Sequence, residues 1–320
     1  MKQFIRRGMH GMKAIGFACC LAACAGATQT PAPPPDRESR IPPEQVKITP
    51  EQDVYPVKSL TGEYADPIPL PYPVNTAGGE DSAFIMPDGD TLYLFFTPDV
   101  GAPLEQQVVD GVTGIYAFRK EAGAWGTAER VLLQEPGKAA LDGCGFVLGE
   151  KMWFCSAREG YTGLHWFTAE RIGGVWQDWR EDDFPAEYEV GELHITADGR
   201  ELYFHSSREG GLGGYDIWVS ENVEGEWLPP VNLAAVNSPQ DDGWPFVSPD
   251  GAELWFTRMA GYSELWRSRR VGGEWGAPVR MFAPFAGEAS TDYEGNVYFT
   301  HHFYKDNVML EADIYVAARN

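Results

Sequence analysis

The sequence has few basic residues and few cysteines, and it has no apolar run long enough to span a bilayer. It contains 25 Lys and Arg against 47 Asp and Glu, for a formal net charge of −22. This balance argues against nucleic acid as a partner, because the phosphate backbone favours a basic surface. The motifs Gly-x-Ser-x-Gly, His-Glu-x-x-His and Cys-x-x-Cys are absent, so no common hydrolase, zinc or redox motif marks an active site. The sequence therefore predicts no metal site and no cofactor.

The N-terminus has the pattern of an export signal. Four basic residues precede the short apolar run "AIGFACCLAA" at 14–23. The run leads into "LAAC" at 21–24, which resembles the lipobox of bacterial lipoproteins. This resemblance implies a signal peptide at 1–23, a lipidated Cys24 and a membrane attachment by the lipid alone. Ala25 in place of aspartate implies an outer-membrane anchor in the cell envelope. An ordinary secretory signal is the alternative.

A proline-rich stretch follows the lipidation site. Residues 24–53 include "TPAPPPDRESRIPPEQ", which is poor in large apolar residues and predicts an extended tether. We expect one large all-β domain at 54–320.

A hairpin signal recurs five times along this domain. Two apolar, aromatic-rich runs are joined by a short turn, usually Asp-Gly or Glu-Gly, as in "FIMPDGDTLYLFF" at 84–96 and "PFVSPDGAELWFT" at 245–257. The other copies lie at 145–156, 194–207 and 290–300. A third apolar run follows each hairpin, and Gly-x-Trp marks a fourth after four of them. These tryptophans, about 50 residues apart, are Trp125, Trp176, Trp227 and Trp275.

The missing fourth strand is predicted at the front of the domain. "GEYADPI" at 62–68 matches "GEWGAPV" at 273–279, with Tyr64 in the tryptophan position. A radial array of four-stranded sheets closed in this way is a β-propeller. The prediction is an all-β, five-bladed β-propeller of four-stranded antiparallel blades, closed by an N-terminal outer strand that pairs with "DIYVAAR" at 313–319. A β-sandwich is the rival fold, but it does not explain the repeat.

The repeats also carry a family resemblance. "SPDGAELWFTR" at 248–258 and "ITADGRELYFHSSREGGLGGYDIWVS" at 195–220 resemble the WD40-like propeller repeats of bacterial envelope proteins, the type found in the periplasmic component of the Tol system. The resemblance implies a propeller in the cell envelope that binds or scaffolds other molecules. It implies no reaction.

Ionisable residues are predicted to gather at one mouth of the propeller. The starts of the inner strands carry one acid per repeat, and the ends of the second strands bring cations to the same side. Converging ionisable groups predict a binding site, whereas solvated rim residues in weak ion pairs are the alternative. The acids are Glu80, Asp142, Glu192, Asp242 and Glu288, and the cations are Arg158, Arg208, Arg258, His301 and His302.

Two functions remain open for this mouth. The first is a non-enzymatic module that binds an envelope protein or a small ligand, cationic or saccharide. The second is a glycoside hydrolase of the five-bladed type, whose chemistry needs two carboxyl groups at roughly 5 to 9.5 Å. A single deep pocket holding a carboxyl pair with raised pKa values would favour the hydrolase.

Two further pairs of residues have alternative readings. His194 and His205 lie on adjacent strands and are either packed core residues or part of a metal site lacking a third ligand. If the turn at 149–150 has two residues, Leu148 faces Lys151, and the same register sets Cys144 opposite Cys155. The two cysteines then form either a disulfide or a pair of packed thiols.

Overall fold

The computed structural model describes residues 35–182 and 184–320. The predicted signal peptide, the lipidation site Cys24 and the first part of the tether lie outside the described residues. Among those that are described, no helix is long and apolar enough to cross a membrane.

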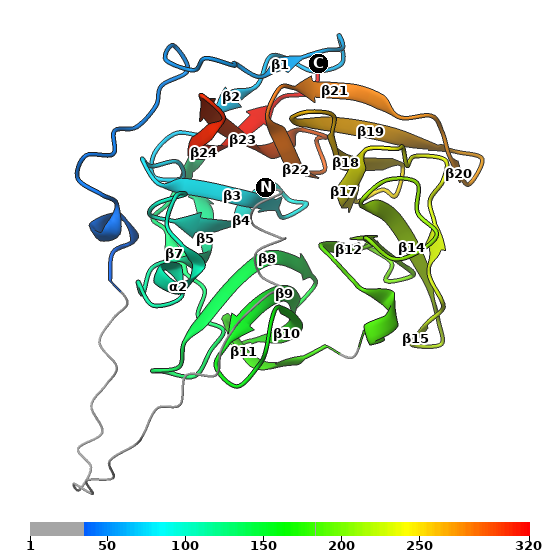
Figure 1. Cartoon of the computed structure of the whole chain (residues 1–320), viewed down its shortest axis with the longest axis horizontal. Helices are drawn as coiled ribbons and strands as arrows, with labels where there is room; N and C mark the ends of the chain where they lie inside the picture. The colour runs from blue at the N-terminus through cyan, green and yellow to red at the C-terminus, as the bar shows by residue number, and fades with distance from the viewer. Residues whose placement is uncertain (1–34, 183) are drawn as a thin grey trace, which may run out of the picture.

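Each of the five repeats forms an antiparallel group of strands, and the groups are arranged around the centre of the molecule (Figure 1). The first group comprises β3 (Gly79–Ile85), β4 (Thr91–Thr97), β5 (Gly114–Glu121), β6 (Ala124–Trp125) and β7 (Glu129–Arg130). The second comprises β8 (Ala140–Leu148), β9 (Lys151–Arg158), β10 (His165–Ile172) and β11 (Val175–Glu181). The third comprises β12 (Leu193–Ile195), β13 (Glu201–Ser206), β14 (Asp216–Val223), β15 (Glu226–Trp227) and β16 (Val231–Asn232). The fourth comprises β17 (Asp241–Val247), β18 (Glu253–Met259), β19 (Ser263–Val271), β20 (Glu274–Trp275) and β21 (Val279–Ala283), and the fifth β22 (Ala286–Thr291), β23 (Val297–Lys305) and β24 (Val308–Ala317).

The remaining elements are short. They are η1 (Arg37–Arg40), α2 (Leu104–Gln107), η2 (Ala186–Tyr188), β1 (Lys58–Ser59) and β2 (Ile68–Pro69). One parallel pair, Ala312 with Gly79, joins the fifth group to the first, so the strands form four sheets, and no sheet of the described chain closes on itself.

The N-terminal phrase pairs where the sequence predicted. In β2, Ile68 and Pro69 pair antiparallel with Val316 and Tyr315 of β24, and Tyr64 forms a bridge with Arg319. Tyr64 is 3% exposed and packs edge-on against Trp255 and Phe282, with ring centroids 5.8 and 5.5 Å away. The predicted pairing and the predicted burial of Tyr64 are confirmed. The sequence did not predict β1, which pairs with β21 of the fourth group.

Four inner strands contain a β-bulge at the same place. The pairing register shifts after Asp81, Gly143, Gly243 and Gly287. The next residue in each case is not glycine but has a positive φ of 52° to 56°. Such a conformation is costly for a residue with a side chain, and bulges of this kind commonly re-aim a side chain beside a functional site. The four bulged residues are Ser82, Cys144, Trp244 and Glu288.

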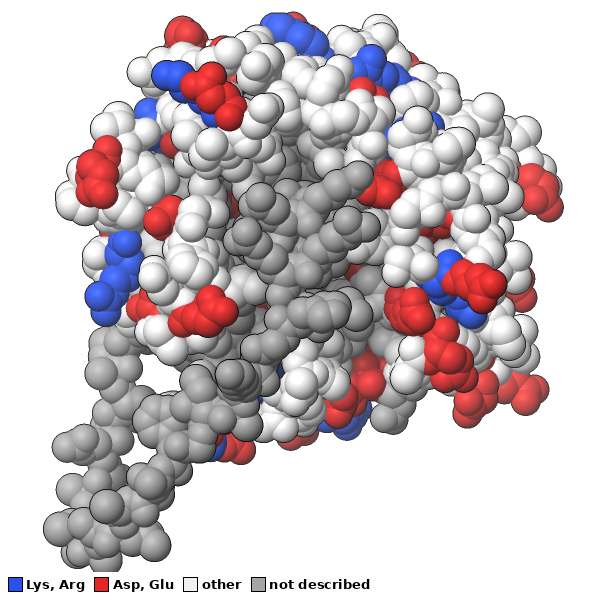
Figure 2. Space-filling view, in the orientation of Figure 1, with Lys and Arg blue, Asp and Glu red and all other residues white. Residues whose placement is uncertain are grey.

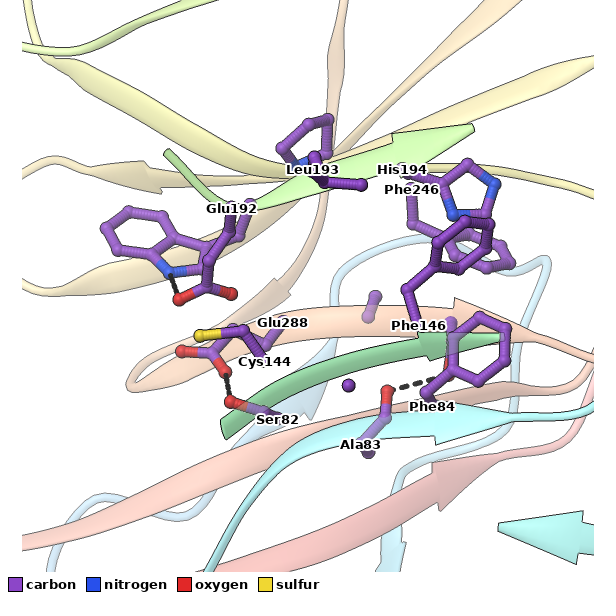
Figure 3. A pocket seen from close by; sticks show the side chains of 15 residues that line it. Ser82, Ala83, Phe84, Cys144, Phe146, Glu192, Leu193, His194, Phe246 and Glu288 are labelled. Atoms are coloured by element: carbon purple, nitrogen blue, oxygen red, sulfur yellow. Dashed lines mark hydrogen bonds between the residues drawn. The ribbon is translucent and has the colours of Figure 1, made fainter. Parts of the chain in front are cut away.

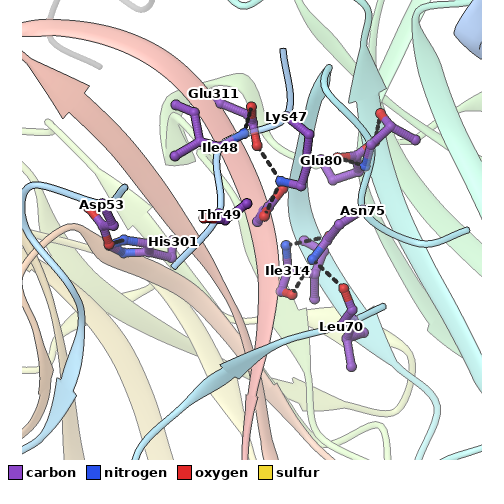
Figure 4. A network of polar contacts seen from close by, with 12 residues as sticks. Lys47, Ile48, Thr49, Asp53, Leu70, Asn75, Glu80, His301, Glu311 and Ile314 are labelled. Atoms are coloured by element: carbon purple, nitrogen blue, oxygen red, sulfur yellow. Dashed lines mark hydrogen bonds and ion pairs between the residues drawn. The ribbon is translucent and has the colours of Figure 1, made fainter. Parts of the chain in front are cut away.

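Residues 35–53, which we call the strap, run along the first and fifth groups (Figures 1 and 4). Arg37 is buried and its Nη1 donates to Glu80 Oε1 at 3.1 Å. Lys47 pairs with both Glu311 and Asp313, and the Asp53 carboxylate lies 2.8 Å from His301 Nε2. The sequence assigned these residues to the tether because their composition cannot form a core, but a charged segment can still dock through ion pairs. The domain boundary at residue 54 stays a prediction.

The surface agrees with the acidic composition. Figure 2 shows Asp and Glu side chains spread around the rim of this face, with Lys and Arg in a few small groups. Apolar residues form the interior, and the largest cluster combines side chains from all five groups.

Candidate functional site

The inner strands of all five groups line one central pocket (Figure 3). Its volume is about 60 Å³. Each group contributes one residue at the same level, and four of these five are the bulged residues. The five are Ser82, Cys144, Glu192, Trp244 and Glu288.

A second level of aromatic rings lies two residues further along the strands. His194 sits between Phe146 and Phe246, with ring centroids 4.6 and 4.5 Å away. Phe84 packs edge-on against Phe146 at 5.3 Å. The pocket therefore has a polar level that carries the two glutamates and a level of aromatic rings in tilted and edge-on contact.

A glycine precedes the polar position in four groups, and close packing explains two of these glycines, Gly191 and Gly243. A Cβ on Gly191 would lie 2.5 Å from atoms of His205, and one on Gly243 would lie 3.2 Å from the same side chain. Only glycine lets the inner strand approach the second strand of its own or the preceding group this closely.

Glu192 and Glu288 are the two carboxyl groups of the pocket. Trp244 Nε1 donates to Glu192 Oε1 at 2.9 Å, and Ser82 Oγ donates to Glu288 Oε2 at 2.6 Å. Burial raises the pKa of Glu192 well above its usual range, and the neighbouring Cys144 and Asp81 add to the effect. Burial likewise raises the pKa of Glu288, together with the charges of Asp81 and Glu192. Both groups therefore hold their protons to a higher pH than an exposed glutamate does.

Asp81 carries the negative charge next to the two pocket glutamates. Burial acts to raise the pKa of Asp81, but its interactions with His302 outweigh burial and lower the pKa. His302 Nε2 lies 3.7 Å from Asp81 Oδ1. The predicted cation His302 thus stabilises the charge on Asp81, which lies next to the pocket residue Ser82.

The two histidines of the third group are packed core residues. Burial lowers the pKa of His194 to about 3 and that of His205 to about 4, so both are neutral at physiological pH. In the described part of the chain, no three His, Cys, Asp or Glu side chains are placed to hold a metal ion.

Three of the five predicted acids lie outside the pocket lining and form buried ion pairs. Glu80 pairs with Arg37 at 3.1 Å, Asp142 with Arg158 at 2.8 Å, and Asp242 with Arg258 at 2.6 Å. Hydroxyl groups complete each pair: Thr76 Oγ1 donates to Glu80, Ser156 Oγ to Asp142 and Ser238 Oγ to Asp242. The structure therefore brings together only Glu192 and Glu288 of the predicted acids.

The other predicted cations also lie apart from the pocket lining. His301 contacts the strap residue Asp53. The guanidinium of Arg208 lies over the Trp218 ring, 4.8 Å from its centroid.

The predicted cysteine register is wrong by one residue. Leu148 does pair with Lys151, but the bulge at Cys144 then sets Gly143, not Cys144, opposite Cys155. Both cysteines are free thiols. A hydrogen bond with Cys155, together with burial, raises the pKa of the Cys144 thiol well above its usual range.

Ser82, Trp244 and Asp81 are site residues that the sequence did not predict. A signal was present, because the polar position is followed two residues later by Phe84, Phe146, His194 or Phe246 in four repeats. Aligning these short strings places Ser82, Cys144, Glu192 and Trp244 at one position.

Comparisons with known proteins bear on the fold alone. No family model matches the chain, and no curated protein matches it. Solved structures that match include TolB from Acinetobacter baumannii, at 13% identity and a TM-score of 0.44, over 76% of this chain and 55% of that one. A putative TolB from Agrobacterium tumefaciens has 16% identity and a TM-score of 0.45, over 84% of this chain and 91% of that one. An endo-arabinase from Bacteroides thetaiotaomicron has 11% identity and a TM-score of 0.46, over 75% and 93%. The strands of the described chain form an all-β fold, and TolB-like propellers are among its structural neighbours.

Proposed function

We propose that the chain is a five-bladed β-propeller of the cell envelope, lipid-anchored through Cys24, that binds a small cationic ligand in its central pocket without catalysing a reaction. The five antiparallel groups and the pairing of β2 with β24 support the five-bladed reading. The observation that carries the function is the pair Glu192 and Glu288 on the polar level of one pocket.

An ammonium group is the ligand chemistry that fits this pair. Both carboxyl groups have raised pKa values, because each is buried and each faces other acids. A cation between the two carboxyl groups offsets the free-energy cost of ionising them. Binding therefore lowers both pKa values and releases protons to solvent. The indole of Trp244 and the ring of Phe246 line the same pocket and favour a cation over neutral ligands.

The size of the pocket favours binding over glycoside hydrolysis. A cavity of about 150 Å³ accommodates benzene. The central pocket, at about 60 Å³, has room for an ammonium head and is smaller than a cavity that accommodates a six-membered ring. The presence of both glutamates in one pocket and their raised pKa values favour a hydrolase, since a general acid needs a raised pKa.

Calorimetry with methylammonium chloride against sodium chloride tests the proposal. We expect affinity to rise between pH 5 and pH 8, with protons released on binding, because the cation competes with the protons on the glutamates. Glu192→Gln and Glu288→Gln should each weaken binding at least tenfold, about 1.4 kcal/mol. The exposed Glu226→Gln is the matched control and should bind like the original protein.

Two results would overturn the proposal. Equal methylammonium affinity in Glu192→Gln and Glu226→Gln would remove the pocket as the site. Turnover of aryl glycosides that disappears in Glu192→Gln and Glu288→Gln would establish the hydrolase instead.

A further inference from the structure

Three arginines stack on aromatic rings at the ends of the second strands. Arg158 lies 4.0 Å from the ring centroid of Phe167, Arg208 lies 4.8 Å from that of Trp218, and Arg258 lies 4.5 Å from that of Trp266. The three rings are equivalent in the fold, because Phe167, Trp218 and Trp266 pair with Phe154, Phe204 and Phe256 of their second strands. Arg158 and Arg208 also share the string "Ser-x-Arg-Glu-Gly".

Only two of these arginines have a carboxylate partner among the described residues. Arg158 pairs with Asp142 and Arg258 with Asp242, whereas no ion pair joins Arg208 to any residue in 35–182 or 184–320. The register explains the difference. Gly143 pairs with Cys155, and the Gly191 N–H donates to the carbonyl of His205, so Val190 occupies the position that corresponds to Asp142.

Two donors in this place are left without an acceptor. Nη1 of Arg208 and Nε1 of Trp218 are both buried and make no hydrogen bond in the described structure. Trp218 is 6% exposed. Leaving buried donors unpaired costs free energy, and a native structure generally pairs them with protein, water or ligand.

We propose that Arg208 and Trp218 form a binding site for the carboxylate group of a ligand, separate from the central pocket and independent of the proposed function. The second group shows the occupied form of the same arrangement. There the carboxylate of Asp142 accepts from Arg158 Nη2 at 2.8 Å and from Ser156 Oγ at 2.6 Å. In the third group, Ser206 matches Ser156, and its hydroxyl donates to the carbonyl of Tyr188 at 3.4 Å and accepts from the backbone N–H of Arg208 at 3.2 Å. Val190, at the position that corresponds to Asp142, supplies no acid to these donors.

The net charge of −22 works against an anionic ligand. Long-range repulsion disfavours anions in general. Selection of a carboxylate therefore depends on the local donors.

Thermal melting with sodium N-acetylglycinate tests the site, with N-acetylglycinamide as the uncharged analogue and sodium chloride at matched ionic strength. At a saturating concentration we expect the carboxylate to raise Tm by about 2 to 4 °C and the amide to leave it unchanged. Arg208→Gln should abolish the response, and the exposed Arg200→Gln should keep it.

Val190→Asp supplies the missing carboxylate from within the chain. We expect this variant to melt above Val190→Thr, which has the same shape without the charge, and to lose the response to N-acetylglycinate, while Val190→Thr retains it. A response of the same size in Val190→Asp and Val190→Thr would overturn the proposal, as would equal effects of the acid and its amide on the unmodified protein.

Discussion

The ion pair between the strap and the first group can be tested by replacing Arg37 with glutamine. Arg37 is 3% exposed and Glu80 fully buried. The guanidinium also donates to the carbonyls of Pro73 and Val74, and it lies 4.8 Å from the ring centroid of Phe96. The substitution therefore leaves Glu80 as a buried carboxylate without its cation.

The expected loss of folding stability is large for a residue in a segment that was predicted to be a tether. Removing one partner of a buried ion pair costs about 3 to 5 kcal/mol. For a domain of this size, each 1 kcal/mol lowers Tm by about 2 to 4 °C, so the expected decrease is about 6 to 20 °C. Arg40→Gln is the matched control, because Arg40 belongs to the same η1 turn and is exposed.

The pH dependence separates a charge effect from lost packing. Burial raises the pKa of Glu80 above its unfolded value, although Arg37 and Thr76 partly offset the shift. The folded state therefore binds this proton more tightly than the unfolded state, and the stability gained is present at low pH and lost as pH rises through the folded pKa. Without Arg37 the pKa of Glu80 rises further.

The Tm difference between Arg37→Gln and Arg40→Gln should thus be largest at pH 7 to 8 and shrink toward about pH 5. Differential scanning calorimetry at several pH values measures it. Equal melting of the two variants at pH 7.5 would refute the reasoning, and so would a difference that does not change with pH.

Two further predictions concern the ends of the chain and the thiols. Deleting residues 54–70 removes β1 and β2 and exposes the edge of β24. We therefore expect a lower Tm than that of the full chain and aggregation detectable by light scattering. Unchanged melting would contradict the proposed closure. Mass spectrometry of the unreduced protein should find Cys144 and Cys155 as free thiols. Their alkylation by iodoacetamide at pH 7.5 should be slow, because the pKa of Cys144 is raised. A mass 2 Da lower, as in a disulfide, would contradict this prediction.

The hairpins were predictable because their signals are local. Two apolar runs around a turn containing glycine specify a hairpin without reference to the rest of the chain, as in β3 and β4 around Gly89, which has a φ of +76°. The pairing of β2 with β24 was also predictable, because the repeated phrase showed which strand was missing. Docking of the strap was not predictable, because a single arginine in a proline-rich segment does not indicate which acid is its ion-pair partner.

The lining of the pocket includes two of the predicted residues, Glu192 and Glu288, and the other predicted residues lie outside it. Counting residues back from each turn assumes strict alternation of side chains, and a bulge breaks that alternation. Counting residues within one repeat does not reveal the bulge at Ser82, Cys144, Trp244 and Glu288. Leaving out the bulge also produced the wrong register for Cys144.

The acids occupy two different positions along the inner strands. This difference explains why only two of the five predicted acids lie in the pocket. The first, second and fourth groups carry an acid two residues before the pocket position, where a buried arginine neutralises it, and Ser82, Cys144 or Trp244 in the pocket itself. The third and fifth groups carry Val190 and Ala286 at the earlier position and a glutamate in the pocket. A shift of two residues thus moves the acid from a structural ion pair to a site where no arginine is part of the lining. Because the earlier acids are already neutralised, only Glu192 and Glu288 offer carboxyl groups to a ligand in the pocket, and they are the residues on which a binding experiment should concentrate.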